Sequence, residues 1–383
     1  MRARSVFLGA LGIGAVAAMA VASCSLVTSY DCFTEPCSRG DAASAADAGA
    51  GCTLRVPPPR PDGGVIETDK RIILAMNAAR FDVAPADAGP SSVGFDLDGL
   101  CTCQPAQRPD PGSCVNARAT EPACDGPGGI DRQSTRLSGT FSRIFGDKNL
   151  QEGLDQGSFS LLIQLTGYDE TANDGLVGVS LFNGVGLRAP DGGVSDGGAP
   201  SFDGGDDWIL DSTSVVGGAE REFVASARDD AAYVAGGRLY ARVRSFTMRF
   251  RVRFVVGAQT LSSTLDFQLD DLILSGDLIP LGGGAFKLER AELAARFPMR
   301  SALALASRAG ACRGTKTYED SREGLCALAD LAGERRADAG APCDALSFVL
   351  GLSAVPARYR GTADAPASFT PCTDDGGADD CVR

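Results

Sequence analysis

Histidine is absent from all 383 residues of this chain. Without an imidazole, the protein has no Ser-His-Asp or Cys-His catalytic machinery and no zinc site that depends on a histidine ligand. It also lacks the side chain that ordinarily titrates near neutral pH. Serine and cysteine hydrolases of the usual kind are therefore excluded.

Other signatures of function are missing too. There is no Walker-type phosphate loop, no HExxH and no CxxC spacing. Residues 193–197 formally match the nucleophile-elbow pattern, but they lie among Asp-Gly-Gly repeats with no base available, so we interpret the match as chance. Basic residues number 36 against 49 acidic ones, and a net charge of −13 gives no general attraction to nucleic acid.

Cysteine, in contrast, is plentiful. Thirteen cysteines without a metal-binding spacing indicate structural disulfides in an oxidising compartment. Setting Cys24 aside, twelve remain in groups of three, four and five: Cys32, Cys37 and Cys52; Cys101, Cys103, Cys114 and Cys124; Cys312, Cys326, Cys343, Cys372 and Cys381. If all twelve pair within the chain, odd groups cannot close internally, so at least one bond joins two groups. If the middle four pair among themselves, Cys52 reaches the C-terminal group.

The first 24 residues have the pattern of an export signal. Arg2 and Arg4 precede an apolar run at 6–22, and small residues lead into Cys24. This resembles the bacterial lipobox, whose cysteine is lipidated before cleavage. The resemblance implies a signal peptide at 1–23, lipid on Cys24 and, because Ser25 is not Asp, the outer membrane. The alternative is an uncleaved anchor, for which the run is short.

The composition of the residues after the predicted signal peptide changes along the chain and divides it into three regions. Residues 24–64 are rich in Ala, Gly, Ser, Asp and Pro and read as a lipidated N-terminus with a flexible tether. Residues 65–285 favour strands, and residues 286–383 favour a helical, cysteine-rich region. The expected strands lie at 71–83, 159–166, 176–183, 222–227, 238–244, 246–256, 259–270 and 272–279.

Helices are expected in four places. Ile130, Leu137, Phe141, Ile144 and Phe145 fall near one helical face, with Asp131 as the cap. Later, 286–297, 301–308 and 321–331 are rich in helix-forming residues. The chain is thus predicted to be mainly β. We expect an antiparallel β-sandwich, lectin-like or jelly-roll-like, with a short helix near its start and a helical, disulfide-rich C-terminal region.

The sharpest structural prediction is a hairpin across Gly257-Ala258. A two-residue type II′ turn pairs Val256 with Gln259. That register sets apolar residues opposite one another: Phe254 and Leu261, Phe250 and Leu265, Met248 and Phe267, Phe246 and Leu269. It also sets Arg249 opposite Asp266, and a slip of one residue would destroy every match.

Two features suggest ligand binding. Arg249, Arg251 and Arg253 share one face of this hairpin and form either an anion or acidic-polysaccharide strip or a solvated face partly neutralised by acidic neighbours. Trp208, the one tryptophan, follows a Gly-rich loop and either stacks on a sugar ring or belongs to the core.

Clustered aspartates suggest a metal. Asp96 and Asp98, then Asp125 and Asp131, flank the middle group of cysteines on turn-rich backbone, which suits a hard cation such as calcium. The alternative is that these aspartates only stabilise turns. The GFDLDG stretch at 94–99 and the DGPGGID stretch at 125–131 resemble segments of uncharacterised exported lipoproteins with predominantly β bodies, a resemblance that brings no known activity.

Two function classes follow. The first is a non-catalytic, membrane-anchored lipoprotein whose β domain binds a glycan or another envelope protein. The second is a secreted hydrolase that uses carboxylates or a metal without histidine. The missing catalytic motifs favour the first.

Overall fold

The computed structural model describes residues 53–63, 70–81, 93–103, 114–119, 123–137, 147–195, 198–219, 222–256, 259–333, 340–365, 372 and 379–381. For 252–256 and 259–263 it describes the backbone alone. The predicted signal peptide and Cys24 lie outside these residues. No helix among them is both long and apolar enough to cross a bilayer.

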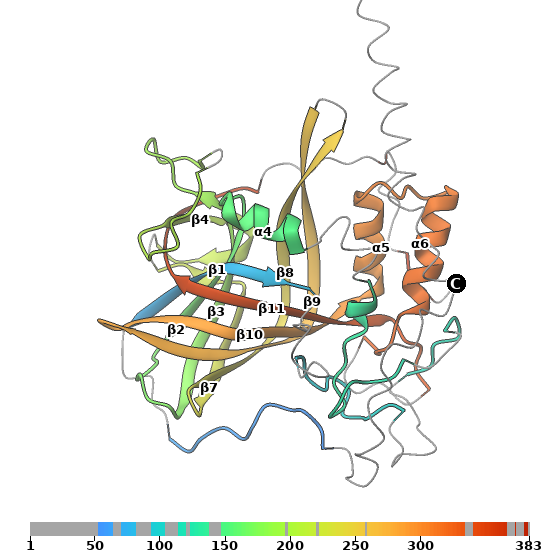
Figure 1. The fold of residues 1–383 in the computed structure, drawn as a ribbon, viewed down its shortest axis with the longest axis horizontal. Coiled ribbons are helices and arrows are strands. Elements are labelled where there is room, and N and C mark those ends of the chain that lie inside the picture. Colours follow the sequence, from blue (N-terminus) through green and yellow to red (C-terminus); the bar gives the residue numbers. More distant parts are fainter. Residues whose placement is uncertain are drawn as a thin grey trace, which may run out of the picture.

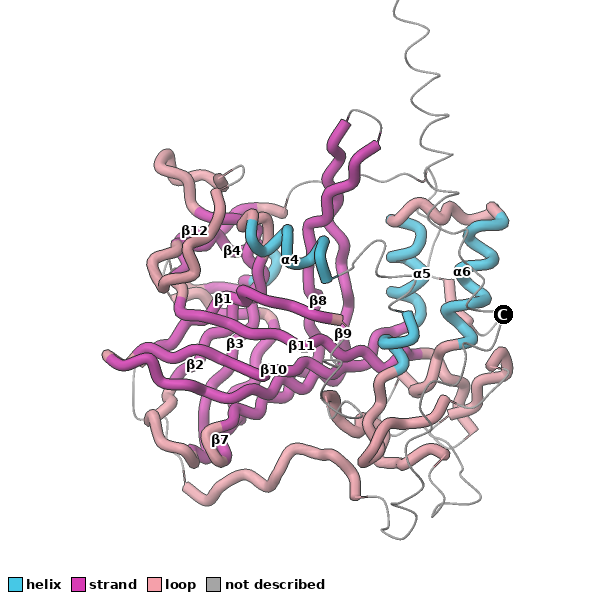
Figure 2. The backbone as a smooth tube through the Cα atoms, in the orientation of Figure 1, coloured by secondary structure: helices cyan, strands magenta, loops and turns pink. Residues whose placement is uncertain are grey.

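A ten-stranded sheet dominates the molecule (Figures 1 and 2). Its order is β12-β4-β3-β2-β1-β11-β10-β9-β8-β7. The strands are β1 (Arg71–Arg80), β2 (Ser160–Thr166), β3 (Asp174–Leu187), β4 (Asp207–Asp211), β7 (Ala227–Ala235), β8 (Arg238–Val256), β9 (Gln259–Gly282), β10 (Ala285–Pro298), β11 (Ala345–Pro356) and β12 (Arg358–Ala363). A separate small ribbon joins β5 (Val215–Gly217) to β6 (Val224–Ala225).

This sheet closes on itself. The long strand β3 pairs with β2 on one edge and with both β7 and β4 on the other. Eight antiparallel strands therefore form a continuous hydrogen-bonded ring, from which β4 and the parallel β12 extend. The prediction of a mainly β fold is confirmed. The expected two facing sheets are not seen, because the hydrogen bonding among the described strands runs around one ring.

The main core fills the ring. Buried side chains from all eight strands, such as Leu74, Ile163 and Phe267, meet in one apolar cluster. The helix α4 (Asp147–Asp155) contributes Leu150 and Leu154 to it and packs against β1 and β8. A smaller cluster lies between β3, β4 and β12.

The predicted hairpin is confirmed in full register. β8 and β9 pair Val256 with Gln259 and Met248 with Phe267, and Arg249 lies opposite Asp266. Phe246, Met248 and Phe250 are buried in the core, as the alternation requires. The four strands expected at 238–279 form two long strands. The gaps expected at residues 245 and 271 do not interrupt the register in which β8 pairs with β9.

The helix expected at 286–297 is wrong. These residues form β10, which pairs with β9 on one side and β11 on the other, and its residues 291–298 are all buried. Two ladders and complete burial outweigh the helix propensity of Ala, Leu, Glu and Arg. β11 was not expected, and with β10 it carries the sheet past the boundary expected at 285.

The other helices are nearer expectation. α5 (Met299–Arg308) matches 301–308, and α6 (Lys316–Ala327) begins and ends earlier than expected. Of the segment at 130–145, the structure describes only the start, where a short 3-10 helix η2 (Gln133–Leu137) follows Asp131; the rest of the predicted helix, with Phe141, Ile144 and Phe145, lies outside the described residues. The Asp131 carboxylate accepts a hydrogen bond from the Leu97 N–H in another segment.

Four described disulfides join Cys103–Cys124, Cys114–Cys343, Cys312–Cys372 and Cys326–Cys381. The predicted bond between groups is confirmed, since Cys114 reaches the C-terminal group across a separation of 229 residues. The middle group is therefore not closed internally. The proposed role of Cys52 lies outside the described residues.

Part of the expected tether belongs to the body. Residues 53–63 run along the sheet (Figure 1). The Arg55 guanidinium pairs with buried Glu292 and lies over the ring of Phe95, and Tyr233 donates a hydrogen bond to the Pro58 carbonyl. The predicted tether therefore does not include residues 53–63.

Candidate functional site

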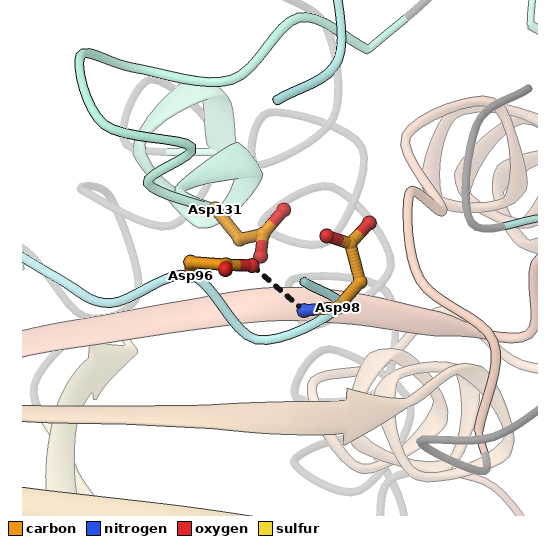
Figure 3. A group of neighbouring side chains, drawn as sticks. All are labelled: Asp96, Asp98 and Asp131. Carbon is orange, nitrogen blue, oxygen red and sulfur yellow. Dashed lines mark hydrogen bonds between the residues drawn. The ribbon is translucent and has the colours of Figure 1, made fainter. Parts of the chain in front are cut away.

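The structure brings the predicted acidic residues together. Asp96, Asp98 and Asp131 each offer a carboxylate oxygen, and the three oxygens lie within 4.8 Å of one another. Figure 3 shows Asp96 and Asp98 on one loop and Asp131 coming toward them from another. Asp125 joins the group through a hydrogen bond with Asp131. We call these four residues the aspartate cluster.

Local backbone chemistry shapes the first loop. The Asp96 carboxylate Oδ1 accepts hydrogen bonds from the backbone N–H groups of Asp98, at 3.1 Å, and Gly99, at 2.6 Å. This is the turn that an aspartate forms with its own following backbone. Gly99 has φ +88°, a conformation that glycine adopts without strain, and this lets the chain turn back.

The second loop packs directly against the first. Asp131 Oδ2 accepts from the Leu97 N–H at 2.6 Å, and Asp125 Oδ2 accepts from the Thr102 N–H at 2.6 Å. Gly129 is required here, since a Cβ at this position would lie 2.5 Å from the Leu100 carbonyl oxygen. The Cys103–Cys124 disulfide holds the two loops together.

Buried charges on β10 position the first loop. Glu292 accepts a hydrogen bond from the Gly94 N–H at 2.7 Å, and Arg296 donates one to the Leu97 carbonyl at 2.6 Å. Both side chains are almost fully buried. The segment expected to be a helix thus supplies, as a strand, the two charges that orient the candidate site.

Crowded carboxylates raise one another's pKa. Burial, with the charge on Asp98 contributing, raises the pKa of Asp96 to about 6 and that of Asp125 to about 7. Burial also raises the pKa of Asp131 well above its usual value, and the charges of Asp98, Asp330 and Asp125 add to the rise. A hard cation would relieve this repulsion, and without one the protonated carboxyls can donate protons near neutral pH.

Asp330 is the residue that sequence reasoning missed. It accepts hydrogen bonds from the N–H and the hydroxyl of Ser347, and burial with the nearby charge of Asp98 raises its pKa to about 7. It lies some 200 residues further along the chain than Asp131. No motif links them, so only the fold could place it near the cluster.

A pocket adjoins the aspartate cluster. Its cavity of about 220 Å³ is lined by Asp96 and Leu97 together with residues 242–244 of β8 and 271–273 of β9. Arg242 and Arg244 are exposed there and alternate with Val243, which is buried in the ring. The pocket therefore lies on the outer face of the ring.

The other predicted binding residues fare differently. Trp208 is fully buried in the smaller core cluster, so the sugar-stacking alternative is wrong. Arg249 is held between Asp266, at 2.9 Å, and buried Asp211, as the neutralised alternative required. Arg251 is half-buried, which leaves no open strip at these two positions. The side chain of Arg253, like all of Cys24, lies outside the described residues.

No family model, curated protein or solved structure matches this chain.

Proposed function

We propose that this chain is an exported lipoprotein, anchored in the outer membrane through Cys24, whose β-rich body binds a ligand of the cell envelope without catalysis. The lipobox-like segment supports the anchor. Disulfides among the described residues agree with an oxidising compartment. The lectin-like sandwich is not needed for this role, because the outer face of the ring supplies the pocket.

The observation that carries the binding role is the pocket with two exposed arginines. At about 220 Å³ it is smaller than the about 300–1,000 Å³ of pockets that bury drug-sized ligands. It therefore suits one small unit, such as a single residue of a longer chain. Guanidinium groups recognise carboxylates through paired hydrogen bonds. Two acidic residues line the pocket as well, but Asp96 is 3% exposed and Asp271 lies 3.5 Å from the Arg296 guanidinium. An acidic glycan of the envelope is therefore the ligand class that suits the pocket size and the two exposed guanidinium groups.

Binding to immobilised alginate and polygalacturonate, with dextran as the neutral polymer, tests this role. We expect the full chain in detergent to bind an acidic polymer and not dextran. The double variant Arg242→Gln/Arg244→Gln should bind about tenfold more weakly or worse. Arg228→Gln, an exposed arginine on β7, is the matched control. Equal binding by both variants would show that the pocket does not bind the polymer.

Mass spectrometry tests the anchor. Protein extracted from membranes should begin at Cys24 and carry lipid on that residue. An unmodified Cys24 in the membrane-extracted protein would contradict the lipoprotein assignment.

A hydrolase is the second candidate, and one observation favours it. Asp125 and Asp131 have raised pKa values and lie beside Asp96, which lines the pocket, so a protonated carboxyl is available as a general acid. Release of reducing ends from the same polymers, abolished by Asp131→Asn, would support hydrolysis. Binding without turnover would support the first proposal.

A further inference from the structure

We propose that the aspartate cluster, Asp96, Asp98, Asp125 and Asp131, binds one calcium ion. The inference does not rest on the proposed function, because a protein that binds no glycan can still hold a structural cation. It begins from the convergence of three carboxylate oxygens within 4.8 Å from two separate loops. A cluster of aspartates alone does not make a metal site, so a second observation is needed.

That observation is an oxygen without a partner. The Asp96 side chain is 3% exposed, and its Oδ1 accepts the two backbone hydrogen bonds of the turn. Its Oδ2 is buried and has no hydrogen-bond partner among the described residues. A buried carboxylate oxygen left unpaired costs free energy, and such groups in native proteins call for an explanation such as a bound ion. Figure 3 shows this carboxyl group lying beside that of Asp131.

The other members also have oxygens to offer. Asp98 accepts from the Leu100 N–H through Oδ1, and Asp131 accepts from the Leu97 N–H through Oδ2. Asp125 is held in the cluster by its hydrogen bond with Asp131. The backbone bonds hold each carboxylate in a fixed orientation, as ligands of a preorganised metal site are held. The loops are therefore built before any cation arrives.

Ligand type favours calcium over magnesium. Oxygen ligands across a calcium ion lie up to about 5 Å apart. The three carboxylate oxygens, all within 4.8 Å of one another, can therefore reach one calcium ion. Calcium also accepts an irregular shell of six to eight oxygens, whereas magnesium demands an octahedron and keeps its waters. Thiolate-seeking metals have no ligand here, since the nearby cysteines are in disulfides.

Calcium binding would fasten two loops that are joined by the Asp131–Leu97 and Asp125–Thr102 hydrogen bonds and by the Cys103–Cys124 disulfide. The first loop leads into Cys101 and Cys103, and the second begins at Cys124. A cation between them neutralises charges that otherwise repel one another. The expected consequence is a stabilised loop pair beside the pocket that Asp96 lines.

The test uses the full chain in detergent, treated with a chelator and desalted. We expect isothermal titration with CaCl₂ to show one site per chain. Millimolar calcium should raise Tm by about 5 °C, and the same concentration of magnesium should raise it by less. No heat and no Tm change at about 10 mM calcium, beyond the range of weak extracellular sites, would overturn the proposal.

A matched pair of variants separates binding from folding. Asp98→Asn keeps an oxygen for the Leu100 N–H and removes one charge from the cluster. Asp203→Asn makes the same change in an exposed turn, where Oδ1 accepts from the Gly205 N–H. We expect Asp98→Asn to weaken calcium affinity at least tenfold with no loss of calcium-free Tm, and Asp203→Asn to change neither. Wild-type calcium affinity in Asp98→Asn would overturn the assignment, whatever the outcome of the glycan experiment.

Discussion

At the scale of single residues, environment divides chemically identical side chains into different roles. Asp203 lies in an exposed turn, where hydrogen bonds from Ser201 and Gly205 lower the pKa of its carboxyl. Asp96 forms the same kind of turn, yet burial raises its pKa to about 6. The turn chemistry is readable from the sequence, whereas the burial depends on strands far along the chain. Hence the aspartates of the cluster could be proposed from sequence, but not their protonation.

Asp330 should make stability depend on pH. Burial raises its pKa from 3.8 to about 7, so the folded chain binds this proton more tightly than the unfolded chain. The resulting stability is complete below about pH 4 and is lost as pH rises toward 7. Asp330→Asn has a neutral side chain at every pH. Its unfolding free energy should therefore fall less between pH 4 and 7 than that of the wild type, and the two slopes should differ by at most about 1.4 kcal/mol per pH unit.

Denaturant titrations of wild type and Asp330→Asn at several pH values, all in chelator, measure the difference. Parallel stability curves between pH 4 and 7 would show that Asp330 does not carry the raised pKa.

Trp208 should behave as a core residue. It is fully buried against Phe182 and Leu210, so Trp208→Ala should cost about 3–5 kcal/mol of unfolding free energy. Val216 is 67% exposed, and Val216→Ala should change stability by less than about 0.5 kcal/mol. Chemical denaturation compares them. Glycan ligands should leave the fluorescence of this one tryptophan unchanged, and a ligand-dependent shift would contradict the buried assignment.

At the scale of elements, strand pairing determined the secondary structure where intrinsic helix propensity did not. The β8–β9 hairpin was predictable because its alternation and turn are local and point to one register. β10 was not, because its composition favours a helix and its strand form depends on β9 and β11. The buried Glu292 and Arg296 on β10 have partners only in that arrangement.

Arg249 should anchor the β8–β9 hairpin. Its guanidinium pairs with Asp211, whose side chain is fully buried, and with Asp266. Arg249→Ala leaves the Asp211 charge buried and unpaired, so we expect a loss of about 3 kcal/mol in unfolding free energy. The double variant Arg249→Met/Asp211→Asn removes both charges and should recover much of that loss.

The exposed pair of Lys316 and Asp320 supplies the control. Lys316 is 86% exposed, and Lys316→Ala should cost less than about 0.5 kcal/mol. Urea unfolding of the three variants measures these values. A loss below about 1 kcal/mol for Arg249→Ala would refute the anchoring role.

At the scale of the whole molecule, contacts between distant segments close the ring. β1 near the start of the described chain pairs with β11 near its end, and Cys114 is bonded to Cys343. Such connections restrict the unfolded chain over long loops, and they make folding depend on non-local pairing. Another such contact lies next to Asp131, where the Gln133 N–H donates to the hydroxyl of Ser347 on β11.

The Cys114–Cys343 disulfide should stabilise the protein more than the Cys312–Cys372 disulfide does. In the chain-entropy model a separation of 229 residues contributes about 1 kcal/mol more than the separation of 60 in Cys312–Cys372. Cys114→Ala/Cys343→Ala should therefore lower the unfolding free energy more than Cys312→Ala/Cys372→Ala. Denaturation under non-reducing conditions measures both, and the reverse order would contradict the entropic account for this protein.

The sequence by itself determined what local chemistry specifies. It predicted a mainly β chain, the β8–β9 register, a disulfide between cysteine groups and the aspartates that meet in the cluster, because alternation, parity and turn-forming residues act over a few positions. Only the tertiary structure decided the closed ring, the strand at β10, the burial of Trp208 and the approach of Asp330. Each of these depends on burial and pairing between residues far apart in the chain, and a single sequence contains no local signal that links such residues.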